Sequence, residues 1–74
     1  MGFRIDYRGV SLFAEYCEKS GHLVGRVKVR SCSHYVRFEE SECGTFEYCF
    51  YMGKYYEGSN VRDAFEAMVY SRNL

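Results

Sequence analysis

The side chains in this sequence that are able to bind a metal or act as nucleophiles belong to four cysteines and two histidines. They are Cys17, Cys32, Cys43, Cys49, His22 and His34. A zinc site drawn from them would have the spacing C-x-H-x8-C-x5-C and would use Cys32, His34, Cys43 and Cys49. That spacing matches no common structural-zinc pattern, and no C-x-x-C pair occurs. We therefore predict reduced thiols and no bound metal, with Cys49 as a small buried hydrophobic residue.

Motifs that mark an enzyme are missing from the sequence. No phosphate-binding loop, nucleophile elbow or H-E-x-x-H motif is present. His22 lies beside a predicted turn and His34 opens a predicted strand, and neither has a recognisable motif around it. A Cys–His pair could still meet in space, since such pairs need not be close in sequence. An exposed polar histidine is the simpler interpretation, so we predict no enzymatic activity, no catalytic residue and no cofactor.

Basic side chains alternate along one segment and suggest a second kind of chemistry, contact with phosphates. Arg26, Lys28 and Arg30 fall on the face opposite the apolar residues at 23, 27 and 29, and Arg37 follows nearby. Tyr35 or Tyr51 could stack on bases beside them. Against this interpretation, the chain carries zero net charge, and a basic row on a strand is most often its solvated face. Nucleic-acid binding by Arg26, Lys28, Arg30 and Arg37 is our alternative prediction.

An aromatic run from Thr45 to Glu57 suggests a third kind of chemistry, contact with another protein. Its alternation predicts a strand with an apolar core face and an opposite face. The core face would carry Phe46, Tyr48, Phe50 and Met52, and the opposite face Glu47, Cys49 and Tyr51. Tyrosine suits interfaces because it joins a large apolar body to a polar tip. We predict that Tyr51, Tyr55 and Tyr56 form a protein-binding face; the alternative is that all three belong to the core.

Charge is unevenly divided along the chain. Residues 1 to 37 hold seven basic and three acidic residues, whereas residues 38 to 74 hold three basic and seven acidic ones. In a compact fold this division either cancels between neighbouring strands or leaves oppositely charged patches, which steer partners and favour self-association.

The elements that must position these side chains are short strands followed by one helix. Alternation predicts strands around residues 3–7, 23–29, 34–39 and 46–52, with turns at 8–9, 19–21 and 31–33. Residues 10–18 fit either a strand or a helix, and the flanking turns favour the strand. A helix from about Val61 to Ser71 is predicted by the stripe of Val61, Ala64, Phe65 and Met68. Asn60 is its expected N-cap, with Asp63 in a capping box and Arg62 paired with Glu66.

Together these elements predict one small α+β domain over residues 1–74, a four- or five-stranded antiparallel meander with a C-terminal helix on one face. One helix of three turns covers about half of such a face, so the rest must curl on itself, meet a second subunit or meet a partner. We predict a homodimer on this ground. No stretch is apolar enough to span a membrane and no signal peptide opens the chain, which predicts a cytoplasmic protein.

The order of short strands ending in M-G-K-Y-Y-E-G-S-N-V-R-D-A-F-E-A-M resembles small proteins of phages and prophages. Among these are anti-CRISPR inhibitors with a sheet-plus-helix fold. The resemblance lies in size and element order over the whole chain and carries no functional residue with it. It implies a stoichiometric blocker that docks on a host or defence protein. Our leading prediction is therefore a non-enzymatic protein-binding module of this type.

Overall fold

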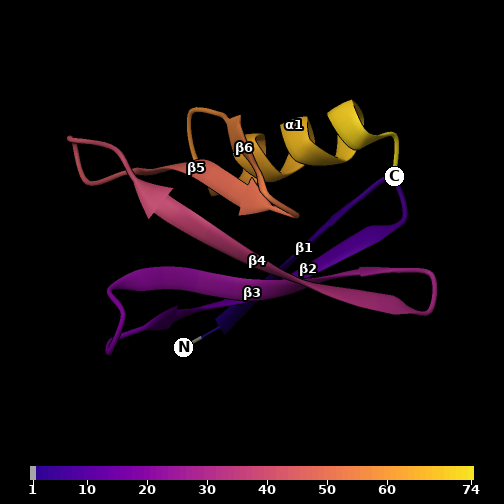
Figure 1. The fold of residues 1–74 in the computed structure, drawn as a ribbon, viewed down its shortest axis with the longest axis horizontal. Helices are drawn as coiled ribbons and strands as arrows, with labels where there is room; N and C mark the ends of the chain where they lie inside the picture. Colours follow the sequence, from indigo (N-terminus) through magenta and orange to yellow (C-terminus); the bar gives the residue numbers. More distant parts are fainter. Residues whose placement is uncertain (1) are drawn as a thin grey trace.

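The computed structural model describes residues 2–74, which form one antiparallel sheet and one helix (Figure 1). The strands are β1 (Gly2–Tyr7), β2 (Val10–Cys17), β3 (His22–Val29), β4 (Cys32–Glu40), β5 (Phe46–Tyr51) and β6 (Lys54–Glu57), and the helix is α1 (Val61–Arg72). Neighbours in sequence are neighbours in the sheet. The predicted α+β fold, with an antiparallel meander and a C-terminal helix, is confirmed, and residues 10–17 are a strand. The predicted strand number of four or five is wrong, because the sheet has six strands.

The additional strand is β6, which lies after the predicted strand at 46–52, where no further strand was predicted. Met52 and Gly53 both adopt left-handed backbone conformations, with φ of 49° and 82°. Two successive residues with positive φ form the tight hairpin turn whose twist matches that of paired strands. Tyr51 therefore lies directly opposite Lys54, and the chain pairs back along β5 instead of leaving the sheet.

The helix begins and ends where the sequence predicts, within one residue. The Asn60 side chain accepts a hydrogen bond of 2.9 Å from the backbone N–H of Asp63, which confirms the N-cap. Arg62 and Glu66 form the predicted ion pair, at 3.5 Å across one turn. The buried face of α1 consists of Ala64, Phe65, Met68 and Val69. The amphipathic stripe is thus confirmed, with Phe65 fully buried at its centre.

The sheet coils around the helix, so that a single core serves both. Helix α1 packs on β5 and β6 at one edge of the sheet and also reaches β1 at the other edge. Gly25 in the middle of β3 permits this curvature, because a β-carbon there would collide with the Phe13 carbonyl oxygen of β2. Residues from all six strands and from α1 form one buried cluster. Of the outcomes considered for the rest of the sheet, curling on itself is therefore the one observed.

Phe46 packs against the core as predicted, but after the register shift opposite Glu39 and Glu40 the rest of strand β5 faces the opposite way from the orientation predicted. Cys49 and Tyr51 point into the core, while Phe50 is half-buried on the other side and Met52 is exposed in the turn. The register explains this orientation, since Cys49 lies opposite Phe38 and Tyr51 opposite Val36, both fully buried residues of β4. Both rows of the strand are largely apolar, so alternation revealed the two faces without showing which one the helix covers.

Candidate functional site

The outer face of the sheet, which lies away from the helix, carries a row of alternating cationic and aromatic side chains. The pairing register places Arg4 of β1 opposite Phe13 of β2, Phe13 opposite Arg26 of β3, and Arg26 opposite Tyr35 of β4. Phe13 is 47% exposed and Tyr35 is 54% exposed. Large rings that remain this exposed in a folded sheet offer a contact surface. We call these four residues the cross-strand row.

The outer surface over β1–β4 is hollowed into an open groove of about 850 Å³. The cross-strand row runs through it, and Val24 and Lys28 of β3 line it as well. One carboxylate, that of Glu15 on β2, also lines the groove. The lining thus combines mainly apolar and basic side chains, the composition of a surface that binds a ligand with flat apolar parts and negative charge. We call this surface the β1–β4 groove.

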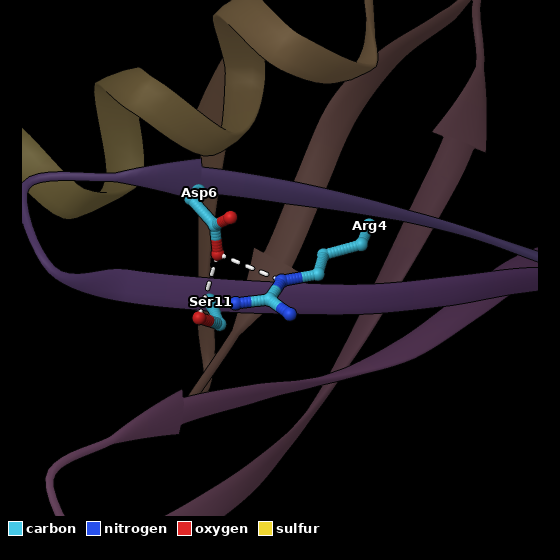
Figure 2. A network of polar contacts seen from close by, with 3 residues as sticks. All are labelled: Arg4, Asp6 and Ser11. Carbon is cyan, nitrogen blue, oxygen red and sulfur yellow. Dashed lines mark hydrogen bonds and ion pairs between the residues drawn. The ribbon is translucent and has the colours of Figure 1, made fainter.

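A polar network fixes the cation at the β1 edge of the groove (Figure 2). The guanidinium of Arg4 donates to the Asp6 carboxylate at 3.1 Å, and the Ser11 hydroxyl donates to the same oxygen at 2.7 Å. The Ser11 hydrogen bond, followed by that from Arg4, lowers the pKa of Asp6 and so keeps the carboxylate ionised. The guanidinium also lies 5.2 Å from the centre of the Phe13 ring. Arg4 is therefore held against Phe13 by its own strand and by β2.

Arg26 and Lys28 are exposed on the outer face of β3, as predicted. Within residues 2–74 neither side chain takes part in a salt bridge or a side-chain hydrogen bond. The residues opposite Lys28 are Ser11 and Ser33, and those opposite Arg26 are Phe13 and Tyr35. No acidic residue therefore lies directly across from either cation, and both charges are available to a ligand.

Arg30 does not continue this basic row. It lies beyond the end of β3, in the turn between Val29 and Cys32, with φ of 56°. Because the chain reverses there, the alternation that puts Arg26 and Lys28 on one face stops at Val29. The prediction that Arg30 shares a strand face with them is wrong.

Arg37 also lies on the outer face, but its guanidinium contacts side chains of β4, β5 and β6. Its guanidinium contacts the Glu39 carboxylate at 3.3 Å, donates to the Tyr55 hydroxyl at 3.4 Å and lies 5.0 Å from the centre of the Phe50 ring. The Phe50 and Tyr55 rings contact each other with centroids 4.8 Å apart. The Tyr55 hydroxyl, and after it Arg37, lowers the pKa of Glu39. We call Arg37, Glu39, Phe50 and Tyr55 the Arg37 cluster.

The three tyrosines predicted to form a binding face are not brought together. Tyr55 is 52% exposed on the outer face, whereas Tyr51 is 1% and Tyr56 8% exposed in the core. Arg72 of the helix donates to the Tyr56 hydroxyl at 3.1 Å and lies 5.2 Å from the centre of the Tyr51 ring. Burial raises the pKa of Tyr51. Successive residues on a strand face opposite sides, so Tyr55 and Tyr56 cannot share one surface.

The cysteines and histidines do not form a cluster. Across residues 2–74, no group of three His, Cys, Asp or Glu side chains lies close enough to hold a metal ion. Cys49 is completely buried, as predicted, and burial raises the pKa of its thiol to about 12. Cys32 and Cys43 are exposed, and Cys17 is half-buried. His34 packs edge-on against Tyr51, with ring centroids 5.9 Å apart.

Charge is sorted along the long axis of the molecule, although the net charge is zero. In an antiparallel meander, alternate turns lie at the same end, and the β1–β2 and β3–β4 turns share one end with the C-terminus (Figure 1). Around this end and the β5–β6 turn lie Arg8, Lys28, Arg30, Lys54 and Arg72. Around the other end, at the β2–β3 turn, the β4–β5 loop and the end of β6, lie Glu15, Glu18, Glu39, Glu40, Glu42, Glu47 and Glu57. The chain thus has a basic end and an acidic end.

Phe13 and Arg4 are the two members of the cross-strand row that were not predicted from the sequence, and Phe13 is the aromatic ring among them. Its segment fits either a helix or a strand, with the flanking turns in favour of the strand, and its importance comes from lying opposite Arg26. That pairing follows from the turn between β2 and β3, whose bounds the sequence does not define precisely. Counting back from the glycine turn at Gly21 would have placed Phe13 near Arg26 without fixing the register.

Comparison with protein-family models, with curated proteins and with solved structures found no match to this chain. Among the described residues, no helix has the length and apolar character needed to cross a membrane.

Proposed function

We propose that the protein is a non-enzymatic binding protein and that its β1–β4 groove binds nucleic acid. The observation that carries this proposal is the cross-strand row, in which exposed rings alternate with cations in a single register across four strands. Sheet faces that bind nucleic acid combine cations for the phosphates with rings on which bases stack. Arg26 and Lys28 have no acidic neighbour opposite them, so their charges are free to contact phosphates.

The zero net charge of the chain does not oppose this function, because charge is sorted by position. The groove meets the basic end at Lys28, two residues from Arg30 in the β3–β4 turn. A polyanion approaching the molecule is attracted to this end and repelled from the acidic end. The charge distribution therefore attracts a nucleic acid and also sets its orientation on the protein.

Salt dependence tests the proposal directly. Affinity for a fluorescent oligothymidylate should fall steeply between about 50 and 200 mM salt, because phosphate contacts release counterions. Lys28→Gln should reduce the slope of log affinity against log salt by about one, the effect of removing one phosphate contact. Lys19→Gln is the matched control, since Lys19 lies in the β2–β3 turn at the acidic end. Affinity that is insensitive to salt, or an equal loss in the Lys19 variant, would refute the proposal.

A second candidate function, the protein-binding inhibitor suggested by the sequence, is favoured by Tyr55. This tyrosine is exposed beside Arg37, and tyrosine and arginine are the residue types that most often carry binding energy at protein interfaces. The partner would be a host or defence protein. A protein captured by the wild-type chain should then be lost with Tyr55→Ala and retained with Lys28→Gln.

Self-association stays a prediction, but its original reason no longer applies. The homodimer was expected because one helix cannot cover a flat sheet, whereas this sheet coils until its core residues are buried within one chain. The sorted charges supply a different reason, since the basic end of one copy complements the acidic end of another.

A further inference from the structure

We infer that the β1–β4 groove binds single-stranded nucleic acid. Two bases of this ligand stack on Phe13 and Tyr35, and the phosphate between them lies beside Arg26. This inference rests on the proposed function and specifies the ligand class. The bases of a duplex cover one another's faces, so that only an unstacked strand presents flat base surfaces to aromatic side chains. DNA and RNA share this chemistry.

The geometry of the cross-strand row supports two separate stacking positions. Phe13 on β2 and Tyr35 on β4 are separated by β3, and neighbouring strands lie about 4.8 Å apart, so the two rings are roughly 10 Å apart. Bases stacked in a helix are separated by only about 3.4 Å along one strand. Neighbouring bases therefore reach the two rings only when the strand is extended and its bases are separated. Arg26 lies between the rings in the same row, at the position of the intervening backbone.

The Phe13 ring is prepared for stacking before any ligand arrives. Arg4 lies against this ring, and the Asp6 carboxylate holds Arg4 while accepting from Ser11 (Figure 2). A ring held in place by its neighbours loses little conformational freedom on binding. Arg4 is thus a positioning residue, since it acts on the ligand through Phe13.

The single-stranded ligand is expected to bind in the groove rather than at the Arg37 cluster, because of these two surfaces only the groove has unpaired cations. In the cluster the guanidinium of Arg37 already contacts a carboxylate, a hydroxyl and a ring. A phosphate there would have to displace Glu39, whereas within residues 2–74 Arg26 makes no ion pair that a phosphate would have to break. Charge complementarity therefore favours binding of the ligand in the β1–β4 groove over binding at the Arg37 cluster.

Abasic oligonucleotides separate stacking from phosphate binding. We compare an oligothymidylate, an oligouridylate, an abasic strand of equal length and a duplex at one low salt concentration. The two base-bearing single strands should bind about a hundredfold more tightly than the abasic strand and the duplex, because each of the two stacked bases contributes about tenfold. Abasic and base-bearing strands binding equally would overturn this inference and leave the proposed function intact. If no oligonucleotide binds at low salt, the proposed function itself is refuted.

Substitutions then assign the stacking to the two rings. Phe13→Leu and Tyr35→Leu should each weaken binding of the oligothymidylate about tenfold and leave the abasic strand unaffected, since leucine is apolar but has no π face. Phe13→Trp keeps an aromatic ring at this position and should retain the affinity. If Phe13→Leu does not fold, this second variant still tests whether an aromatic ring at position 13 supports binding. Tyr70→Leu, which changes an exposed tyrosine on the helix, should have no effect. Equal losses for the abasic strand, or an equal loss with Tyr70→Leu, would overturn the assignment.

Discussion

The outer face of the sheet has two halves that use the same residue types in different ways. On β1–β4, Arg26 lies between Phe13 and Tyr35, and no acidic residue lies opposite it. On β4–β6, Arg37 lies beside Phe50 and Tyr55, but Glu39 two residues along the same strand pairs with it. An arginine among aromatic rings is common to both. The difference lies in the acidic neighbour.

This difference teaches that register decides whether a surface cation stabilises the fold or is free to bind. A guanidinium with a carboxylate at 3.3 Å has much of its charge balanced within the protein. The guanidinium of Arg26, which lies between Phe13 and Tyr35, keeps its charge for a ligand. The Arg37 cluster is therefore expected to affect stability, and the β1–β4 groove is expected to affect binding.

The largest effect on stability is expected when tyrosines in three regions, the core, the Arg37 cluster and the groove, are each replaced by alanine. Tyr51→Ala should lower the free energy of unfolding by about 3–5 kcal/mol, because it removes a completely buried ring from the core. Tyr55→Ala should cost about 1 kcal/mol through its loss of contact with Phe50. Tyr35→Ala should change stability by no more than about 0.5 kcal/mol. Urea denaturation measures all three, and a Tyr35 variant as unstable as the Tyr51 variant would show that the groove belongs to the structural core.

A smaller effect is expected at Gly25, which lies beneath the groove. Gly25→Ala places a methyl group against the Phe13 carbonyl oxygen and the Ala14 backbone, so β2 and β3 must shift apart. Overpacking of this kind typically costs about 1–3 kcal/mol. Because the displaced carbonyl belongs to Phe13, oligonucleotide affinity should fall together with the melting temperature. Ser71→Ala, an exposed change on the helix away from the groove, is the control. Unchanged affinity in a destabilised Gly25 variant would show that the groove does not depend on the curvature of the sheet.

Much of this fold could be predicted from the sequence because its signals are local. Alternation located four of the strands, the flanking turns favoured a fifth at residues 10–18, and the Asn60 cap with its apolar stripe located the helix. Strand β6 was missed because its turn places a non-glycine residue, Met52, in a left-handed conformation, which propensity does not favour. The inward face of β5 was misjudged because two largely apolar faces look equivalent until the helix covers one of them.

The candidate site was harder to predict because the pairing register of the strands decides which side chains lie next to one another. The sequence identified Arg26 and Lys28 as exposed cations and Tyr35 as a possible stacking ring, and all three line the groove. It could not show that Phe13 is the ring beside Arg26, or that Arg37 is paired with Glu39 and Tyr55. Both depend on pairings between strands, and a shift of one residue would move each side chain to the opposite face.

The smallest effect on stability is expected from substitution of Glu39. This substitution also tests where the boundary between the two halves of the outer face lies. Its folded-state pKa lies below the ordinary value, so its ionised form stabilises the fold at neutral pH, and this stabilisation is lost as the pH falls through the lowered pKa. Since its side chain is about one-third exposed, Glu39→Gln should cost only about 0.5–1 kcal/mol at neutral pH. The two proteins should become equally stable in acid, where the wild-type carboxyl is also neutral. Urea unfolding across this pH range measures the difference.

Glu18→Gln is the matched control for this experiment, because Glu18 is exposed at the same end of the sheet and belongs to neither region. Its stability should follow that of the wild type at every pH. If Arg37 is held by Glu39, oligonucleotide affinity at low salt should rise slightly in Glu39→Gln, since releasing the guanidinium adds one free cation to the outer face. If Glu39→Gln changes neither stability nor affinity, Arg37 is already as free as Arg26. The whole outer face, rather than one half of it, would then be the surface on which a polyanion binds.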